Sequence, residues 1–455
     1  MSDYSVINPY NDEVIKEITY TSRAETQQIL KRVVKGQQII ANMTPYERSQ
    51  VLMKLAELLE RDKNKIAQQI TLEMGKTLTD SLIEMDRAIT TVKTSSYEAL
   101  RIYGEVIPTD IASLRRDKKG IVEHFPVGVV LAITPFNFPI NLSVHKIGPA
   151  IAAGNAVLFK PGPQNILSGQ MLTNLCWEAG MSPDYFQIIN PDIPVLSELV
   201  ASPDIQCISF TGGVVAARAI AKNAGIKKLL FELGGNDPLI VMPDGDIDLA
   251  VKTAVNQRFW TAGQRCTASK KVFLHEKVYE EFKKKLVAAS INLKIGDPTK
   301  GETIVGPVVN KKAADEVMRR IEQAVKAGAK VLLGNKREGN IIYPTILENV
   351  PASCDLVKEE TFGPVIPLIS FKDIEEVIEQ VNSSSFGLQA GVFTQNLQTI
   401  KLLFKKLEVG ALAVNDGPGF RAEHIPFGGV KNSGLGREGV AYAIREMSYL
   451  KTLIL

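Results

Sequence analysis

The stretch GVVLAITPFNFP, residues 128–139, decides the fold of this chain. Its first part, 128–134, is the short apolar run expected of a buried strand, and Pro135 ends it. Similar runs follow along the chain: NAVLFK (155–160), FQII (186–189), QCISF (206–210) and KLLFE (228–232). Helical patterns lie between them, for example at 165–179 and 214–224. Strands that alternate with helices predict βαβ units around a parallel sheet.

Four polar side chains stand at or just past the ends of these apolar runs. They are Asn137, Lys160, Thr211 and Glu232. Open parallel sheets bind their ligands beyond the carboxyl ends of the strands. Position alone therefore makes these four residues candidates for a functional site.

The segments on either side of this region complete the predicted architecture. SRAE (22–25) and TPYE (44–47) are capping boxes that open helices. A third helix should end at Gly75, and a fourth should cover roughly 79–102. From about 238 to 416 strands and helices alternate again, which predicts a second α/β domain. The apolar tail YLKTLIL needs a partner strand, from this chain or from another subunit.

Length and composition exclude several classes of protein. A chain of 455 residues is expected to form two or three domains, and 45% apolar with 23% charged residues is ordinary for a soluble enzyme. A net charge of +3 predicts no nucleic-acid or membrane-surface partner. The polar N-terminus has no signal-peptide core, and no apolar run approaches the roughly 20 residues that span a bilayer. Four cysteines without paired spacing and four scattered histidines predict no metal site and a reducing cytoplasm.

Cys266 is the one cysteine with polar neighbours, in the stretch TAGQRCTASKK at 261–271. Arg265 beside it supplies positive charge, which favours the nucleophilic thiolate. Most free cysteines are instead small buried hydrophobes, and Cys176 and Cys207 fit that description. Cys354 is expected in a loop. Sequence position alone leaves both interpretations of Cys266 open.

A nucleophile also needs a base and a stabiliser for the oxyanion. Glu232 ends an apolar strand, so burial should raise its pKa toward the range of a general base. Asn137 lies between two prolines, which hold its backbone stiffly enough for an oxyanion donor. The alternatives are a surface salt bridge for Glu232 and an ordinary turn for Asn137, and each is more common for an isolated residue.

Six motifs taken together narrow these alternatives. TPFNFP, FTGG, FELGGNDP, GQRCT, EETFGPV and PFGGVKNSGLGREG resemble, in order, the motif series of the NAD(P)-dependent aldehyde dehydrogenase superfamily. The resemblance runs from residue 8 to about 452. Within the superfamily, the sequence resembles the lactaldehyde, non-phosphorylating glyceraldehyde-phosphate and succinate-semialdehyde dehydrogenase branches. It implies that Cys266 is the nucleophile and Glu232 the general base. It also implies that Asn137 and the Cys266 backbone N–H form the oxyanion hole.

The same resemblance implies a cofactor site for NAD or NADP and no metal. Its residues are Thr134, Pro135, Phe136, Lys160, Pro163, Thr211, Gly212, Gly213, Leu233, Gly234, Glu360 and Phe362. The family's KPSE is KPGP here, so Pro163 replaces the glutamate that holds the adenosine 2′-hydroxyl. Because a carboxylate there would repel a 2′-phosphate, NADP should be accepted, with NAD usable too.

Cations near the expected substrate pocket favour a small polar or anionic aldehyde. The substrate-binding candidates are Arg265, Thr267, His145, Arg421 and Phe427. The substrates that fit are lactaldehyde, glyceraldehyde or its phosphorylated or sulfonated three-carbon analogues, and succinate semialdehyde. The alternative role for Arg265 is to lower the thiol pKa or to pack outward.

The implied fold is α/β, with a Rossmann-like cofactor domain at 1–107 and 126–233 and a catalytic domain at 234–424. Residues 108–125 and 441–455 would form a β-strand oligomerisation element, IVEH pairing with LKTLIL, in a homodimer or homotetramer. The reaction would oxidise the aldehyde through a cysteine thioester. A CoA-acylating dehydrogenase of this fold and a catalytically silent binding protein are the alternatives. The presence of Glu232 argues against the first, and the intact Cys266, Glu232 and Asn137 argue against the second.

Overall fold

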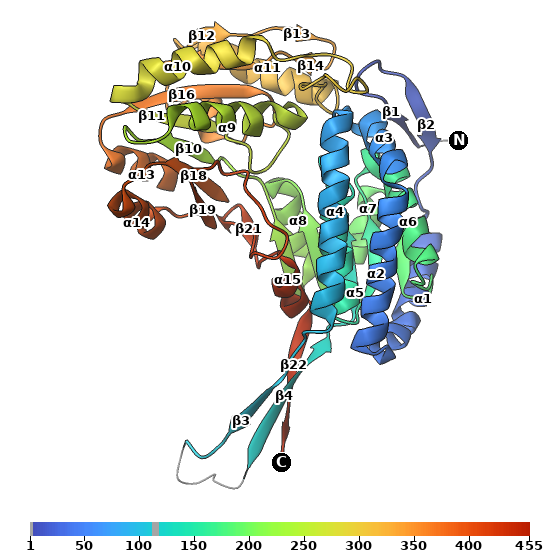
Figure 1. Ribbon diagram of the computed structural model, residues 1–455. Helices are drawn as coiled ribbons and strands as arrows, with labels where there is room; N and C mark the ends of the chain where they lie inside the picture. The colour runs from blue at the N-terminus through green and yellow to red at the C-terminus, as the bar shows by residue number, and fades with distance from the viewer. Residues whose placement is uncertain (1–2, 112–117) are drawn as a thin grey trace.

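The computed structural model describes residues 3–111 and 118–455, which form two α/β units and a projecting β arm (Figure 1). The first unit contains a six-stranded sheet in the order β21-β9-β8-β5-β6-β7. Its strands are β5 (Val129–Ile133), β6 (Ala156–Lys160), β7 (Phe186–Ile188), β8 (Cys207–Thr211), β9 (Lys228–Glu232) and β21 (Gly434–Leu435). The first five are parallel, and β21 joins β9 antiparallel. The predicted strands and their parallel pairing are confirmed.

The helices of the first unit surround this sheet and connect its strands. They are α1 (Arg23–Asn42), α2 (Pro45–Arg61), α3 (Lys63–Met74), α4 (Leu78–Ala99), α5 (Asn141–Ala152), α6 (Ile166–Glu178), α7 (Ile193–Ala201), α8 (Val214–Ala224) and α15 (Val440–Glu446), with the 3-10 turn η1 (Pro163–Asn165). The capping box of α2 is complete, since Thr44 and Glu47 bond reciprocally. In α1 only half of the motif forms, where Ser22 accepts from Glu25 N. Gly75 ends α3 at φ 72°, as predicted.

The second unit is built on a seven-stranded sheet in the order β12-β15-β16-β11-β10-β18-β19. Its strands are β10 (Pro238–Val241), β11 (Lys271–His275), β12 (Lys330–Leu333), β15 (Thr345–Glu348), β16 (Val365–Phe371), β18 (Gln389–Phe393) and β19 (Ala411–Val414). Its helices are α9 (Ile247–Phe259), η2 (Trp260–Gly263), α10 (Glu276–Ile291), α11 (Lys311–Lys326), α12 (Asp355–Lys358), α13 (Ile374–Asn382) and α14 (Leu397–Lys406). Small two-stranded sheets add β1 (Tyr4–Ile7) with β2 (Val14–Ile18), β13 (Arg337–Glu338) with β14 (Ile341–Ile342), and β17 (Phe386–Gly387) with β20 (Val430–Lys431). The second alternating region is therefore an α/β unit, as predicted.

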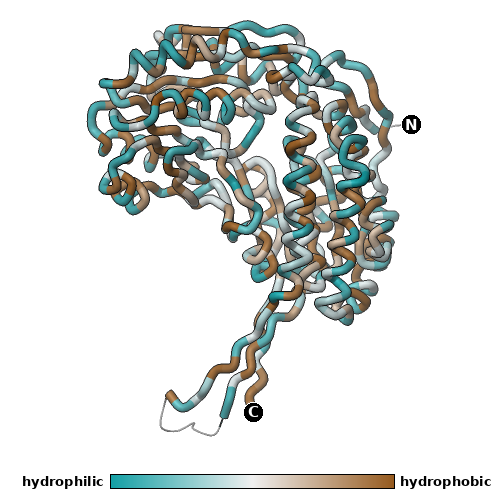
Figure 2. The backbone as a smooth tube through the Cα atoms, viewed as in Figure 1, coloured by the Kyte–Doolittle hydropathy of each residue, from teal (hydrophilic) through white to brown (hydrophobic). Residues whose placement is uncertain are grey.

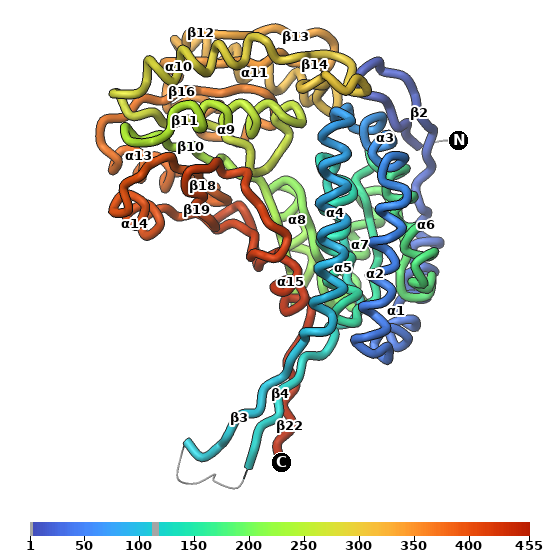
Figure 3. Tube along the Cα trace, in the orientation of Figure 1, coloured from blue at the N-terminus to red at the C-terminus, as the bar shows by residue number. Residues whose placement is uncertain are grey.

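A three-stranded arm extends away from both units (Figure 3). It consists of β3 (Glu105–Pro108), β4 (Lys119–Pro126) and β22 (Ser448–Ile454). Lys451 pairs with Glu123 and Thr452 with Val122, so the predicted pairing of IVEH with LKTLIL is confirmed. Apolar and polar residues mix along the arm (Figure 2), and its β22 edge leaves apolar side chains such as Leu453 and Ile454 exposed. Residues 112–117 of the predicted arm lie outside the described residues.

The C-terminal segment differs from its expected assignment. Residues 441–447 were assigned to the oligomerisation element, but α15 packs on α4 and α5 of the first unit. Val440, Ala443, Ile444 and Met447 are buried in that unit's core. The apolar spacing of these residues along one helical face explains the placement, because it needs a core to cover it. Only 448–454 belong to the arm.

Two searches of the described residues concern membranes and metals. In the part of the chain that the structure describes, none of the helices combines the length and the apolarity needed to cross a membrane. Within the same residues no three His, Cys, Asp or Glu side chains are grouped to hold a metal ion.

Candidate active site

A cavity of about 210 Å³ lies where the ends of β5, β8 and β9 meet loops of the second unit. It is lined by Pro135, Phe136, Asn137, Leu142, Thr211, Gly212, Gly213, Leu233, Gly234, Cys266, Glu360 and Phe362. All of these except Leu142 were predicted from the sequence as catalytic or cofactor residues. The fold thus brings together residues from positions 135 to 362 at the carboxyl edge of the first sheet, where α/β proteins bind ligands.

The loop that carries Cys266 is strained and tightly held. It follows η2, where Thr261 and Ala262 adopt positive φ values of 53° and 50°, which side-chain-bearing residues rarely do. Asp80 on α4 accepts a hydrogen bond from Thr261 N at 2.8 Å. Asn137 Nδ2 donates to the carbonyl oxygen of Gln264 at 2.9 Å. These bonds fix Cys266 beside Asn137, the predicted oxyanion donor.

Burial raises the pKa of the Cys266 thiol to about 11, and the charge of Glu360 acts in the same direction. The charges of Lys270 and Arg421 oppose this rise and favour the thiolate. The sequence had suggested Arg265 as the cation that activates the thiol. Among the cations, Lys270 lowers the Cys266 pKa more than Arg421 does. The charge of Arg265 also interacts with Cys266, while its guanidinium donates to Gly419 O. Lys270 carried no motif signal of its own.

Glu232 ends β9 and is buried, with neither carboxylate oxygen hydrogen-bonded to any residue that the structure describes. Burial raises its pKa well above the ordinary value, and the nearby charge of Glu438 raises it further. Arg421 and Lys146 act in the opposite direction. The surface salt bridge considered for Glu232 is therefore excluded. A buried, unpartnered carboxyl group of raised pKa has the properties of a general base.

The residues predicted to hold a dinucleotide fit such a ligand. Helix α8 begins after Gly213, and no side chain among the described residues caps its N-terminal amides, which are a favourable place for phosphate. Thr211 Oγ1 is buried without a partner in residues 3–111 and 118–455. A Cβ at Gly234 would lie 2.1 Å from Glu360 Oε2, so the glycine lets this carboxylate lie against the backbone as observed.

The outer part of the predicted cofactor site lies beyond the cavity lining. Burial lowers the pKa of Lys160 to about 8, and its ammonium donates to Pro161 O at 3.1 Å. Pro163 O accepts from the hydroxyl of Tyr4 at 3.2 Å. Thr134 is buried and accepts from Ser143 Oγ at 3.3 Å. The Lys160 ammonium has one acceptor, Pro161 O, among the described residues, so its other N–H groups can donate to a ligand.

Comparison with known proteins agrees with this geometry, since the model of the aldehyde dehydrogenase family matches residues 1–453. The chain belongs to this family. It is 53% identical over 452 residues to the sulfoacetaldehyde dehydrogenase of Neptuniibacter caesariensis, covering 99% of both chains. A lactaldehyde dehydrogenase of Methanococcus aeolicus is 39% identical, with 99% of this chain and 97% of the relative covered. The crystal structure of glyceraldehyde-3-phosphate dehydrogenase GapN from Methanocaldococcus jannaschii, complexed with NADP, superposes with a TM-score of 0.96 at 37% identity, covering 100% and 99%.

The predicted family, the α/β aldehyde dehydrogenase fold and the use of NAD(P) are confirmed. The protein is an NAD(P)-dependent enzyme that oxidises aldehydes to carboxylic acids.

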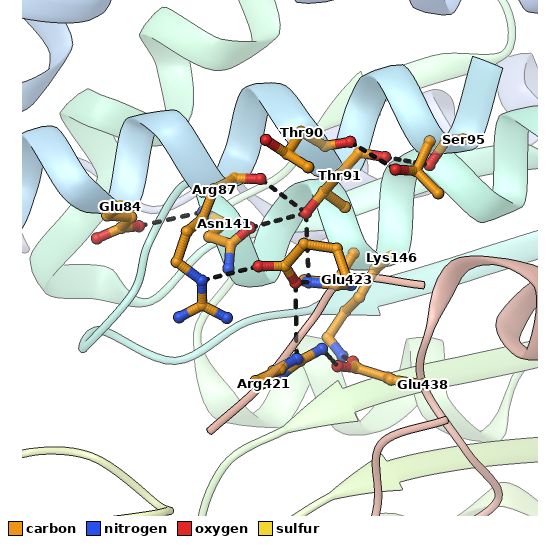
Figure 4. Close-up of polar contacts among 12 residues, drawn as sticks. Glu84, Arg87, Thr90, Thr91, Ser95, Asn141, Lys146, Arg421, Glu423 and Glu438 are labelled. Atoms are coloured by element: carbon orange, nitrogen blue, oxygen red, sulfur yellow. Dashed lines mark hydrogen bonds and ion pairs between the residues drawn. The ribbon is translucent and has the colours of Figure 1, made fainter. Parts of the chain in front are cut away.

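A network of charged side chains joins α4, α5 and the loop before α15 in this aldehyde dehydrogenase (Figure 4). Glu423 accepts from Arg87 Nε at 2.7 Å and contacts His145 Nε2 at 2.6 Å. Arg421 donates to Glu438 at 3.0 Å, and its Nε lies 3.7 Å from Glu423. Carboxylates thus pair with the predicted substrate residues Arg421 and His145. His145 is buried, and burial and the charge of Arg421 lower its pKa.

Arg265 differs from Arg87 and Arg421, which pair with carboxylates. Its guanidinium donates to Gly419 O at 3.4 Å, and it forms no ion pair with any residue the structure places. Burial lowers its pKa, and the like charge of Arg87 lowers it further. The charge of Asp80 acts in the opposite direction and favours the charged guanidinium.

Phe427 and Thr267 are the remaining predicted substrate residues, and Arg87 is a nearby charged residue that the sequence did not indicate. The guanidinium of Arg421 stacks 3.9 Å from the ring centre of Phe427, and Thr267 is buried after the nucleophile. Arg87 on α4 was missed by sequence analysis. An isolated arginine on an amphipathic helix usually belongs to the solvated face, and only the fold brings Glu423 to it.

Proposed function

We propose that this enzyme oxidises a short aldehyde that carries an anionic group, with the sulfonate of sulfoacetaldehyde as the first candidate. The observation that carries the proposal is the Arg265 guanidinium, which has a single weak acceptor and no carboxylate partner among the described residues. Arg265 is only partly exposed, and a partly desolvated guanidinium without an ion-pair partner gains from binding an anion. A sulfonate presents several oxygens that a guanidinium can bind through paired N–H donors.

A second arginine, Arg87, lies close enough to Arg265 for their charges to interact. Arg87 is held through its Nε by Glu423, and Figure 4 shows its two terminal nitrogens pointing away from that carboxylate. Glu423 also lies within 3.7 Å of Arg421, so this one carboxylate holds two guanidinium groups in place. Burial alone would raise the pKa of Glu423, but His145, Arg87 and Arg421 hold it below the ordinary value. Glu423 is therefore a fixed anion that orders the cations without neutralising Arg265.

The proposed chemistry uses Cys266, Asn137 and Glu232. The Cys266 thiolate attacks the aldehyde carbon, and the Asn137 amide and Cys266 N–H stabilise the alkoxide that forms. Bound NAD(P)⁺ supplies the acceptor for the hydride that leaves this carbon, and an acyl thioester remains on Cys266. Glu232 takes a proton from water as the water attacks the thioester, which releases the acid and the thiolate. The unpartnered Glu232 favours this route over acyl transfer to CoA.

The outer cofactor site favours acceptance of NADP. Pro163 places no carboxylate near the adenosine ribose, and Lys160 offers an ammonium with one backbone acceptor. We also propose that the first unit binds the cofactor, that the second unit carries the nucleophile, and that the exposed arm joins copies of the chain. The exposed apolar side chains of β22 support the last point.

A substrate panel tests the function. We expect sulfoacetaldehyde to give the highest kcat/KM, ahead of lactaldehyde, glyceraldehyde 3-phosphate and succinate semialdehyde, with propanal far behind. Each aldehyde is measured with NAD⁺ and with NADP⁺ by the absorbance of the reduced nicotinamide. Propanal or lactaldehyde turned over as efficiently as the anionic aldehydes would contradict the anionic-substrate proposal. Strict NAD dependence would contradict the cofactor proposal.

A further inference from the structure

Lys270 is a buried cation that joins the nucleophile loop to the cofactor side of the cavity. Its ammonium donates to Arg265 O at 2.6 Å and to Glu360 Oε1 at 3.3 Å. It also lies 4.8 Å from the centre of the Phe362 ring. The Lys270 backbone N–H donates to Asp237 O at 2.9 Å, and β11 begins at the next residue. The ammonium is thus anchored to a strand of the second sheet.

The Lys270 ammonium binds the carbonyl oxygen of the peptide bond between Arg265 and Cys266. A peptide is planar, so the carbonyl of Arg265 and the N–H of Cys266 belong to one rigid unit. A cation at the oxygen fixes the orientation of that plane. It also draws electron density from the nitrogen, which makes the N–H a stronger donor, as in hydrogen-bond chains that polarise one another.

The other hydrogen bonds near the Arg265–Cys266 peptide are longer and uncharged, or they reach the preceding residue. Ala268 N also donates to Arg265 O, at the longer distance of 3.3 Å and without a charge. Asn137 Nδ2 and Val309 N bond to Gln264, one residue earlier. The loop begins with Thr261 and Ala262 at positive φ, a conformation that the surrounding contacts must hold in place. The Lys270 bond is the shorter one, at 2.6 Å. Burial lowers the pKa of Lys270, and the charge of Glu360 acts in the opposite direction and favours the ammonium, whose bonds are the stronger kind.

We propose that Lys270 is a positioning residue, which orients and polarises the Arg265–Cys266 peptide so that the Cys266 N–H can serve as the backbone half of the oxyanion hole. The inference rests on the proposed roles of Cys266 and Asn137. It assigns Lys270 a task in the acylation step, separate from being the counter-ion of Glu360.

The test compares Lys270→Met with Lys271→Met. Lys271 is the matched control, because it is also a buried lysine and its ammonium lies 3.4 Å from Val357 O, away from the nucleophile loop. We expect Lys270→Met to slow the burst of reduced cofactor about tenfold or more with little change in KM, since losing a direct oxyanion donor costs about 10²–10³ in rate. Lys271→Met should keep the wild-type burst, and Lys270→Arg should restore part of it.

Alkylation of Cys266 by iodoacetamide separates the proposed effect from a change in thiol ionisation. Alkylation needs the thiolate but no oxyanion hole. Removing the cation should move its pH profile to higher pH, and the burst should remain slow after correction for the thiolate fraction. A wild-type burst rate, or a burst loss fully explained by the alkylation shift, would overturn the inference.

Two further variants keep the outcome decisive. If Lys270→Met does not fold, as judged by its thermal melt, Lys270→Gln retains a neutral N–H donor and should give an intermediate burst rate. Wild-type bursts in Lys270→Gln and Lys270→Arg together would also refute the role. Cys266→Ala tests the underlying mechanism: a burst that survives there refutes the proposed function, whereas a normal burst in Lys270→Met alone refutes only the present inference.

Discussion

Replacing Arg265 with leucine should damage the oxidation of an anionic aldehyde and spare that of a neutral one. The arginine donates one weak bond, to Gly419 O at 3.4 Å, and it pairs with no carboxylate among the described residues. Its removal therefore leaves no buried anion without a partner, and it relieves the repulsion with Arg87. We expect the free energy of unfolding to change by less than about 1 kcal/mol.

The size of the kinetic effect follows from the lost contact. A hydrogen bond to a charged group contributes about 1.5–3 kcal/mol, and 1.4 kcal/mol corresponds to a factor of ten. The kcat/KM for sulfoacetaldehyde should therefore fall about 10- to 150-fold. Propanal has no charge to lose and should react at close to the wild-type rate.

The assay measures kcat/KM for sulfoacetaldehyde and propanal, in wild type and in Arg265→Leu, from the absorbance of the reduced cofactor. A thermal melt of each protein checks that the fold is intact. Equal losses for both substrates would show that Arg265 serves the Cys266 thiolate. That result would remove the main support for an anionic substrate.

Three other substitutions test the charged groups. Glu232→Gln should keep the burst of reduced cofactor but slow the release of acid. A base of raised pKa makes wild-type deacylation faster as pH rises, and the variant should lose this pH dependence. Burst and steady-state rates measured across pH check both expectations. Burial raises the pKa of Glu73 to about 7, so ionisation lowers the free energy of unfolding as pH rises from about 4.5 to 7, by about 3 kcal/mol in all. Glu73→Gln should therefore raise Tm more at pH 8 than at pH 5, and equal shifts would contradict this. Arg421→Leu removes an ion-pair partner of both Glu438 and Glu423. We expect chemical denaturation to show a free energy of unfolding lower by about 3–5 kcal/mol. A loss as small as that of Arg265→Leu would show that these ion pairs do not stabilise the fold.

The strands of the first sheet could be predicted because a parallel strand covered on both faces reads as a continuous apolar run. β5 and β6 match their predicted runs to within a residue, and a proline follows each strand within two residues. β21 escaped prediction for the opposite reason. It is two residues long, in a glycine-rich stretch, and its pairing with β9 is purely tertiary.

The cavity could be predicted where motifs carried its residues, as for Cys266 and Glu360. The charge pattern could not. Which cation faces the thiol and which is paired depends on side-chain directions, so Lys270 and Arg87 carried no signal. Arg421 carried a signal, but its carboxylate partners lie on separate turns of the folded chain.

The late return of β21 and α15 to the first unit has a consequence for synthesis of the chain. Between Glu232 and Gly434 the ribosome must complete the whole second unit, which takes roughly 10–40 s at about 5–20 residues per second. During that interval the β9 edge is unpaired, and the face of α4 and α5 that receives α15 is uncovered. The nascent first unit therefore presents an open strand edge and an apolar groove together, which is the kind of surface that aggregates or recruits a chaperone. Residues 434–447 close both at once, so Glu232 at the end of β9 is enclosed only after the second unit has been made.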